Sequence, residues 1–156
     1  MGYDVRVLHV PATPFLAVRR RAARSEFSRV VPEGCGTVWD FIQAAGLVSG
    51  GRNLAVYLDG EIDLEIGVEI DAAEAAAALR DGSEVRLSRS PAGRVATTTH
   101  EGPYRGLGDA HEAVQRWCEA NGHALAGPCW EIYGHIRDEK AEPTTDVLYL
   151  ISDPNA

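Results

Sequence analysis

Residues 38–46 read Val-Trp-Asp-Phe-Ile-Gln-Ala-Ala-Gly, and residues 114–122 read Val-Gln-Arg-Trp-Cys-Glu-Ala-Asn-Gly. The two stretches share a valine, an aromatic residue, an apolar residue and a closing glycine, 76 positions apart (114 − 38 = 76). Tyr57 and Tyr133 keep the same offset, and weaker echoes pair Pro11 with Pro91, Ala17 with Ala96, Ile66 with Val147, Val68 with Tyr149, and Ile70 with Ile151. Two similar halves that each carry one hydrophobic face are expected to pack together, and their junction is a natural ligand site.

Length, charge and cysteine content limit the class of protein. The 156 residues suffice for one domain, or for two fused halves around a shared core. The formal net charge of −8 argues against direct nucleic-acid binding, and the basic run at 19–24 is interpreted as a solvated strand end. No apolar run is long enough to span a membrane and no secretory signal begins the chain, so we expect a cytoplasmic protein. A reduced interior also fits three cysteines without CxxC spacing: Cys35, Cys118 and Cys129.

The periodicity of apolar residues predicts the same order of elements in both halves. The first half is predicted as strands at 4–9 and 14–20, a loop at 21–31, a helix at 37–45, and strands at 53–58 and 63–70. A linker helix follows within 71–82, from Ala72 to Arg80, behind a capping-box-like start at Asp71. The second half is predicted as strands at 84–89 and 94–101, a helix at 106–121, strands at 129–135 and 146–152, and an exposed hairpin loop at 136–145.

These elements predict an α+β fold in a single domain over residues 1–156. The domain would consist of two pseudo-two-fold β-β-α-β-β modules, 1–70 and 83–153, joined by the linker helix at 71–82. We expect antiparallel sheets with the helices on one face and a ligand cleft between the halves.

The strand at 129–135 carries a carboxylate where the repeat breaks. Side chains alternate between the faces of a strand, so Glu131 and Tyr133 share one face. At the 76-residue offset, Glu131 corresponds to Ala55 (131 − 76 = 55). Burying a carboxylate lowers the stability of the fold by several kcal/mol unless the group is paired or protonated. Two interpretations remain open. Glu131 points to water or pairs with an arginine, or it belongs to a ligand site with Tyr133 and Tyr57.

Four further residues are weighed as site candidates. Trp39 lies about 100° from the apolar stripe of its helix, and it is either a ligand contact or a rim residue over the linker. Gly67 interrupts a strand, which marks a bulge or a closely approached surface. His100 and His135 are weak candidates because they lie near the strands expected to face the cleft.

Motifs for metals and cofactors are absent. The segment 106–111 lacks the third glycine of a dinucleotide-binding fingerprint, and His111-Glu112 lacks the second histidine of a zinc-protease helix. No GxSxG motif, phosphate-binding loop or zinc spacing occurs either. We therefore predict no metal and no cofactor.

Two segments resemble the GyrI-like (gyrase-inhibitor-like) family: residues 96–107, with His100 and Gly102-Pro103-Tyr104, and residues 127–133, with Gly-Pro ahead of Glu-Ile-Tyr. This family is the effector-binding domain found alone or behind the DNA-binding domains of AraC- and MerR-type regulators. The resemblance spans essentially the whole chain. It implies a pocket between two modules, with Glu131 at its base meeting cationic or polar ligands. Because the chain begins at its first strand, we expect a stand-alone member of the family.

The first functional hypothesis is a binding module for aromatic, often cationic, drug-like molecules. Aromatic rings would supply cation–π contacts of about 0.5–2 kcal/mol each, and Glu131 would neutralise the ligand's charge. The predicted ligand-binding residues are Trp39, Tyr57, Gly67, His100, Tyr104, Glu131, Tyr133 and Tyr149.

The second hypothesis is an enzyme, because some stand-alone members of the resembled family hydrolyse the cyclopropane of DNA-alkylating compounds. Glu131, its pKa raised by burial, would act as general base on a water. Tyr133, or alternatively Tyr57, would stabilise the carbonyl that gains charge as the ring opens. A third possibility, suggested by the family's name, is a non-catalytic protein–protein inhibitor module.

Overall fold

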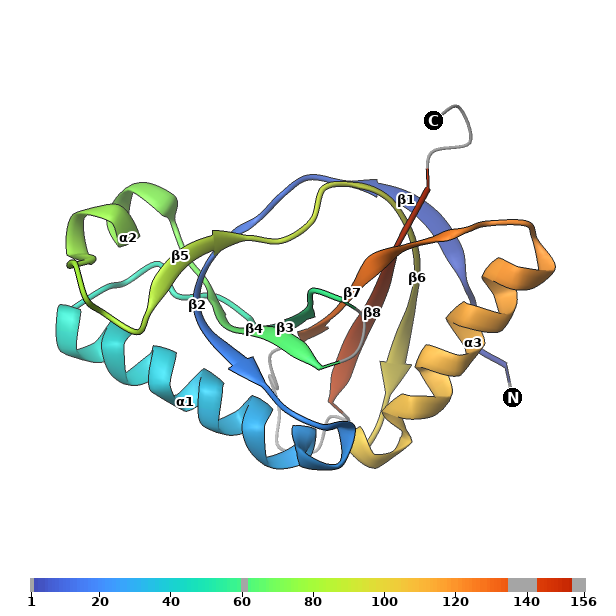
Figure 1. Cartoon of the computed structure of the whole chain (residues 1–156), viewed down its shortest axis with the longest axis horizontal. Helices are drawn as coiled ribbons and strands as arrows, with labels where there is room; N and C mark the ends of the chain where they lie inside the picture. Colours follow the sequence, from blue (N-terminus) through green and yellow to red (C-terminus); the bar gives the residue numbers. More distant parts are fainter. Residues whose placement is uncertain (1, 60–61, 135–142, 153–156) are drawn as a thin grey trace.

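The structure is a computed structural model that describes residues 2–59, 62–134 and 143–152. The described strands form one eight-stranded antiparallel sheet in the order β1-β6-β8-β7-β3-β4-β2-β5 (Figure 1). Its strands are β1 (Arg6–Val10), β2 (Pro14–Arg21), β3 (Asn53–Tyr57), β4 (Asp63–Glu69), β5 (Arg86–Arg89), β6 (Gly93–Glu101), β7 (Leu125–Tyr133) and β8 (Thr144–Ile151). The helices are α1 (Phe27–Ala45), α2 (Ala72–Ala78) and α3 (Leu107–Ala120), and two 3-10 turns are η1 (Arg24–Glu26) and η2 (Tyr104–Gly106).

The strand order is palindromic. If β1 to β4 are matched with β5 to β8, the order reads the same from both edges, and β3 and β7 form the central pair. In that pair Ala55 lies directly opposite Glu131. The α+β class predicted from the sequence is confirmed, and the centre of the sheet is where the two halves meet.

Helices α1 and α3 cover one face of the sheet (Figure 1). Helix α1 packs on β2, β3 and β4, while α3 packs on β6 and β8. Their buried residues, such as Val38 and Val114, join one core with Tyr57, Cys129 and Tyr149 of the sheet. Side chains on this face of β3, β7 and β8 therefore lie between the two helices.

The other face of the central strands is also buried. Trp130, which is 1 % exposed, packs there with Phe15, Leu54 and Leu148. The alternation predicted for the strand at 129–135 is thus present, with Trp130 on one face and Cys129 in the core beneath the helices. A carboxylate at position 131 must point into the helix-covered side.

Helix α1 is longer than predicted, and the prediction of a loop at 21–31 is wrong. The helix begins at Phe27, ten residues before the predicted start at 37. Pro32 and Gly34 lie inside this helix. Because both residue types are unfavourable in helix interiors, they weaken the helical signal in the sequence. Gly34 is needed for packing, because a Cβ atom there would lie 2.8 Å from Cγ2 of Ile66 on β4.

The remaining elements differ from prediction mainly at their ends. Strand β7 begins at Leu125, and β8 begins at Thr144, inside the segment predicted as a hairpin loop. Residue 135 of the predicted strand and residues 136–142 of the predicted loop lie outside the described residues. The linker helix ends at Ala78, and Asp71 caps it by accepting a hydrogen bond from the amide of Glu74. Across the described residues, no helix is both long and apolar enough to cross a membrane.

Candidate functional site

Glu131 lies in the middle of β7 and is 5 % exposed. The hydroxyls of Tyr57 and Tyr133 both donate to its Oε1, at 2.8 and 2.6 Å. Nε2 of His111, on α3, lies 2.6 Å from its Oε2. Within residues 2–59, 62–134 and 143–152 no arginine or lysine pairs with this carboxylate. The interpretation that Glu131 points to water or is paired with an arginine is therefore wrong.

A second set of polar groups extends the cluster behind His111. Nδ1 of His111 lies 2.7 Å from the hydroxyl of Tyr149, on β8. Nε2 of Gln115, one helical turn further along α3, donates to the same hydroxyl at 3.0 Å. A continuous chain of hydrogen bonds thus connects Gln115 with Glu131, and we call these side chains, with Tyr57 and Tyr133, the carboxylate cluster.

The cluster keeps Glu131 ionised. Burial raises the pKa of Glu131, but the hydrogen bond and charge of His111, followed by the hydroxyls of Tyr133 and Tyr57, lower it below the ordinary 4.5. The expectation that burial would raise this pKa overall is wrong, because the donors outweigh the loss of solvation. Burial and the charge of Glu131 raise the pKa values of Tyr57 and Tyr133, so both hydroxyls keep their protons and act as donors.

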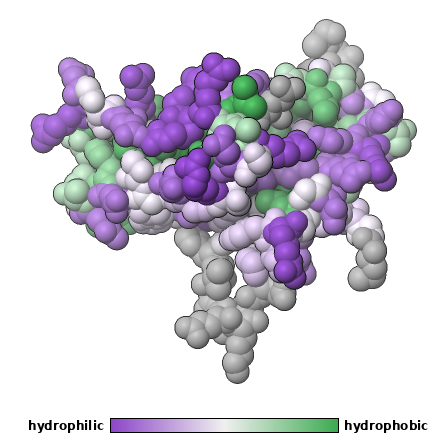
Figure 2. Space-filling model, turned by 60° about the horizontal axis from the view of Figure 1, so that its bottom comes forward, coloured by the Kyte–Doolittle hydropathy of each residue, from purple (hydrophilic) through white to green (hydrophobic). Residues whose placement is uncertain are grey.

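Aromatic rings enclose the carboxylate. Phe27, at the start of α1, packs on Tyr57 with ring centroids 5.1 Å apart. Tyr104, in η2, meets Tyr133 edge to face at 5.7 Å and is itself 52 % exposed. The face of the molecule shown in Figure 2 is largely hydrophilic, with hydrophobic residues in small separate patches. Tyr104 is thus an exposed ring in contact with a tyrosine that hydrogen-bonds the buried Glu131.

Trp39 and Gly67 lie apart from the carboxylate cluster. The indole Nε1 of Trp39 donates to Oδ1 of Asn53 at 2.7 Å, and its ring packs beside Gly50 in the loop before β3. A Cβ atom at Gly67 would lie 1.6 Å from the carbonyl oxygen of Leu16. The close approach at Gly67 is thus that of the neighbouring strand β2.

His100 also has structural partners. Its Nδ1 lies 2.9 Å from the hydroxyl of Tyr3, and its Nε2 lies 2.9 Å from the carbonyl oxygen of Pro103. These bonds join the end of β6 to the N-terminal segment and to the turn before η2. His135, the other weak candidate, lies outside the described residues.

Sequence reasoning missed His111 and Gln115. A usable signal existed, because His111 is four residues after Leu107 and three before Val114, on the buried stripe of its helix. Thr145 was missed as well: its side chain is fully buried opposite Tyr133, and its Oγ1 has no hydrogen-bond partner in the described part of the chain. It offers a polar contact on the same face of the sheet.

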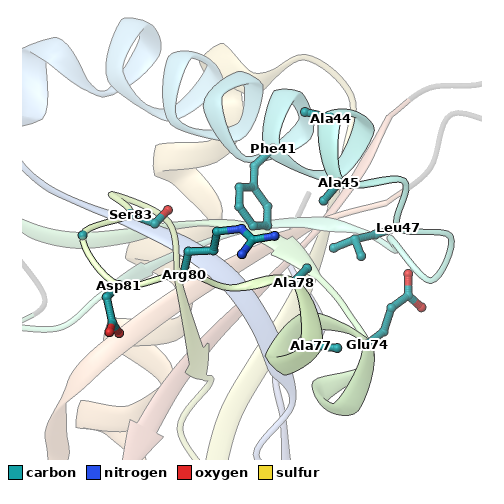
Figure 3. Close-up of a pocket in the computed structure, with 11 residues that line it drawn as sticks. Phe41, Ala44, Ala45, Leu47, Glu74, Ala77, Ala78, Arg80, Asp81 and Ser83 are labelled. Atoms are coloured by element: carbon teal, nitrogen blue, oxygen red, sulfur yellow. The ribbon is translucent and has the colours of Figure 1, made fainter.

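A separate groove of about 940 Å³ lies between the C-terminal end of α1, α2 and the segment that follows α2 (Figure 3). Phe41 and several alanines line it together with Arg80, whose side chain extends toward Phe41 in Figure 3, and Asp81, which points away. Its lining includes no residue of the carboxylate cluster. Among the described residues, no group of three or more His, Cys, Asp or Glu side chains is placed to hold a metal ion.

Comparison with known proteins places this geometry in a family. Residues 3–152 match the family model of the GyrI-like small molecule binding domain. No relative was found among curated proteins.

Solved structures share the fold at low sequence identity. The C-terminal domain of EcmrR is 20 % identical with a TM-score of 0.75, and the match covers 98 % of this chain and 99 % of that one. In the EcmrR–DNA complex the match spans 59 % of the EcmrR chain. SAV2435 bound to tetraphenylphosphonium is 12 % identical with a TM-score of 0.63, covering 97 % and 94 %. A hydrolase from Listeria innocua is 15 % identical with a TM-score of 0.59, covering 97 % and 93 %.

Proposed function

Because the chain belongs to the GyrI-like small molecule binding domain family, we propose that it binds aromatic, cationic organic molecules at Glu131. The observation that carries this proposal is an ionised carboxylate, 5 % exposed, held by hydroxyls and a histidine and enclosed by aromatic rings. A buried carboxylate without a permanent cation attracts a positive charge strongly, because little water screens it. The bound tetraphenylphosphonium of SAV2435, an aromatic cation on the same fold, supports this ligand class.

The rings of the site suit a ligand that carries both aromatic rings and a positive charge. Each cation–π contact contributes about 0.5–2 kcal/mol, and ring stacking makes few geometric demands. Tyr104 is 52 % exposed and contacts Tyr133, whose hydroxyl donates to Glu131, so a ligand that approached along these rings would meet Tyr104 first. These properties favour recognition of several ligands of one class, as in multidrug binding.

A carboxylate has about four acceptor positions, so the three donors on Glu131 leave room for one further contact. A cation without hydrogen-bond donors needs no acceptor position and requires only proximity to the charge. The hydroxyl of Thr145, unpaired among the described residues, offers a contact to a polar group on the ligand.

The test compares a cation with a neutral molecule of similar rings. We expect calorimetric titration to show that tetraphenylphosphonium binds more tightly than triphenylphosphine oxide. Glu131→Gln removes the charge but keeps the shape, so it should weaken cation binding tenfold or more and change neutral binding little.

Glu119→Gln, an exposed position on α3, is the matched control and should bind both probes as the unaltered protein does. Equal cation affinity in the Glu131→Gln and unaltered proteins would refute the role of this carboxylate.

A second candidate function is hydrolysis of cyclopropane-containing alkylating compounds. It is favoured by an ionised Glu131 beside two protonated tyrosines, which are a base and hydrogen-bond donors in one site. Glu131 would take a proton from water while the water oxygen bonds to a cyclopropane carbon. The ring C–C bond breaks, its electron pair moves onto a conjugated carbonyl, and that oxygen accepts a hydrogen bond from Tyr133 or Tyr57. The proton held by Glu131 then passes to that former carbonyl oxygen, which neutralises its negative charge and leaves the ring-opened alcohol as product. The Listeria hydrolase with this fold supports the reaction class.

Mass spectrometry separates the two functions. If the protein is a hydrolase, incubation with a cyclopropane-containing alkylator yields the water adduct, and Glu131→Gln lowers turnover by orders of magnitude while neutral substrate still binds. Glu119→Gln should retain turnover. If no adduct exceeds the background while tetraphenylphosphonium binds tightly, the protein only binds its ligands.

A further inference from the structure

His111 occupies the position from which a cation would neutralise Glu131. Its side chain is 20 % exposed, and both of its ring nitrogens have partners: Glu131 Oε2 at 2.6 Å and the Tyr149 hydroxyl at 2.7 Å. Because Nε2 faces a carboxylate oxygen, this nitrogen carries a hydrogen in either charge state of the ring. The state of Nδ1 decides whether the ring is an imidazolium.

The hydroxyl of Tyr149 can serve both states of Nδ1. It accepts a hydrogen bond from Gln115. When His111 is neutral, Tyr149 donates to Nδ1. When His111 is protonated, Nδ1–H donates to the tyrosine oxygen and the hydroxyl hydrogen turns away from the ring. Neither state leaves a ring nitrogen unpaired, so His111 gains or loses a proton without breaking the cluster.

The surrounding groups leave Glu131 as the charge that balances His111. Burial raises the pKa values of the titratable groups that face His111 from the sheet: Tyr57 on β3, Cys129 and Tyr133 on β7, and Tyr149 on β8. All of these stay neutral near pH 7. On α3 itself, Glu112 pairs with Arg116.

More distant groups act weakly on the same cluster. Cys35 of α1 acts on Tyr133, and Arg24 and Asp59 both act on Cys129, with opposite signs. When the His111 ring carries both hydrogens, it forms with the carboxylate a pair of no net charge, enclosed by neutral groups.

We propose that His111 is a specificity-determining residue, a built-in cation that competes with cationic ligands for Glu131 and gives up its proton when they bind. This coupling rests on the proposed binding at Glu131. A ligand cation beside the carboxylate repels the imidazolium charge, so the neutral ring is favoured and one proton leaves. A neutral ligand leaves the proton in place.

Reciprocity between ligand and proton fixes the direction of the pH effect. As pH falls and His111 becomes protonated, the proton competes better and cation affinity falls, by up to about tenfold per pH unit for one proton. Affinity for a neutral ligand stays nearly constant over the same range. His111 therefore makes the preference for cations strongest at higher pH.

The experiment counts protons released on binding. Tetraphenylphosphonium and triphenylphosphine oxide are titrated calorimetrically between about pH 5 and pH 8, in pairs of buffers that differ in ionisation enthalpy. The unaltered protein should release close to one proton per cation at the acidic end and none with the neutral probe. His111→Gln should release none, bind the cation with little pH dependence, and bind it more tightly than the unaltered protein at low pH.

His123→Gln is the matched control, because His123 stacks on Trp117 away from the carboxylate cluster, and it should release protons as the unaltered protein does. Cation binding without proton release, or equal release by His111→Gln, would overturn the coupling and leave binding at Glu131 intact. If neither the unaltered protein nor His111→Gln binds the cation at any pH, the proposed function is overturned as well. If His111→Gln fails to fold, the two probes on the unaltered protein still test the coupling, because a cation that binds without releasing a proton would overturn it.

Discussion

The two halves of the sheet differ most where they touch. Ala55 on β3 and Glu131 on β7 face each other, and they are also 76 positions apart, so they are equivalent under the sequence repeat. Equivalent positions that face each other cannot both be glutamate at low cost, because two buried carboxylates repel and one must take up a proton. A single ionised carboxylate at the junction therefore requires the repeat to break at this pair.

The same contrast extends to the partners of Glu131. At the 76-residue offset, His111 corresponds to Cys35 and Gln115 to Trp39 (111 − 35 = 115 − 39 = 76). Burial raises the pKa of Cys35 to about 11, so this thiol stays neutral, and its sulfur lies against the carbonyl of Gly67. The first half thus has a neutral thiol and a tryptophan at these positions, while the second half has the histidine and glutamine that join the hydrogen-bond chain to Glu131.

The first half still contributes to the site through aromatic rings. Tyr57 crosses the junction to donate to Glu131, and Phe27 supports its ring. The second half therefore supplies the carboxylate, and both halves supply the aromatic rings around it. The ligand site proposed above therefore lies at the contact of the halves.

Restoring the repeat at the junction is expected to have the largest effect. Ala55→Glu would set a second carboxylate opposite Glu131 in fully buried space. Ala55→Gln, which adds the same bulk without charge, should cost about 1–3 kcal/mol of unfolding free energy through overpacking. Ala55→Glu should cost roughly 3 kcal/mol more at pH 7, because a buried charge without a partner is added. Urea denaturation measures both.

The double variant Ala55→Glu, Glu131→Gln checks the cause. It contains one carboxylate at the junction, so it should recover much of the difference between Ala55→Glu and Ala55→Gln. Equal stability of Ala55→Glu and Ala55→Gln at pH 7 would mean that the two positions do not share one buried space.

Most of the fold could be predicted from the sequence because apolar periodicity reports the buried face of each element directly. The order of strands and helices followed from that pattern. The first ten residues of α1 could not be predicted from it, since Pro32 and Gly34 weaken the helical signal. Only the packed structure shows that Ile66 leaves no room for a side chain at Gly34.

The site was predictable where it depends on strand geometry. Alternation places Glu131 and Tyr133 on one face, and the offset brings Tyr57 to the neighbouring strand. His111 was missed because it was compared with motifs of adjacent residues, whereas its partner lies 20 positions away on a strand. The direction of the pKa shift of Glu131 could not be predicted either, since it depends on how many donors reach the buried carboxylate.

Acid should lower the free energy of unfolding by less than Ala55→Glu does, through protonation of Glu131 in the second half. The pKa of Glu131 is lowered on folding, so the ionised group contributes stability that is fully present above its unfolded value near 4.5. This stability is lost as pH falls through the lower folded pKa. Each unit of difference corresponds to about 1.4 kcal/mol, and Glu131→Gln should remove this part of the pH dependence.

Urea denaturation of the unaltered protein and of Glu131→Gln, at a series of pH values from about 7 downward, measures the effect as a difference of slopes. Exposed carboxylates such as Asp63, whose pKa Arg19 lowers through a hydrogen bond, are shared by both proteins and cancel in this difference. Glu119→Gln should follow the unaltered protein at every pH. Identical pH dependence in Glu131→Gln and the unaltered protein would show that the donors around Glu131 do not favour its ionised form, and the contrast between the two halves would then be one of shape alone.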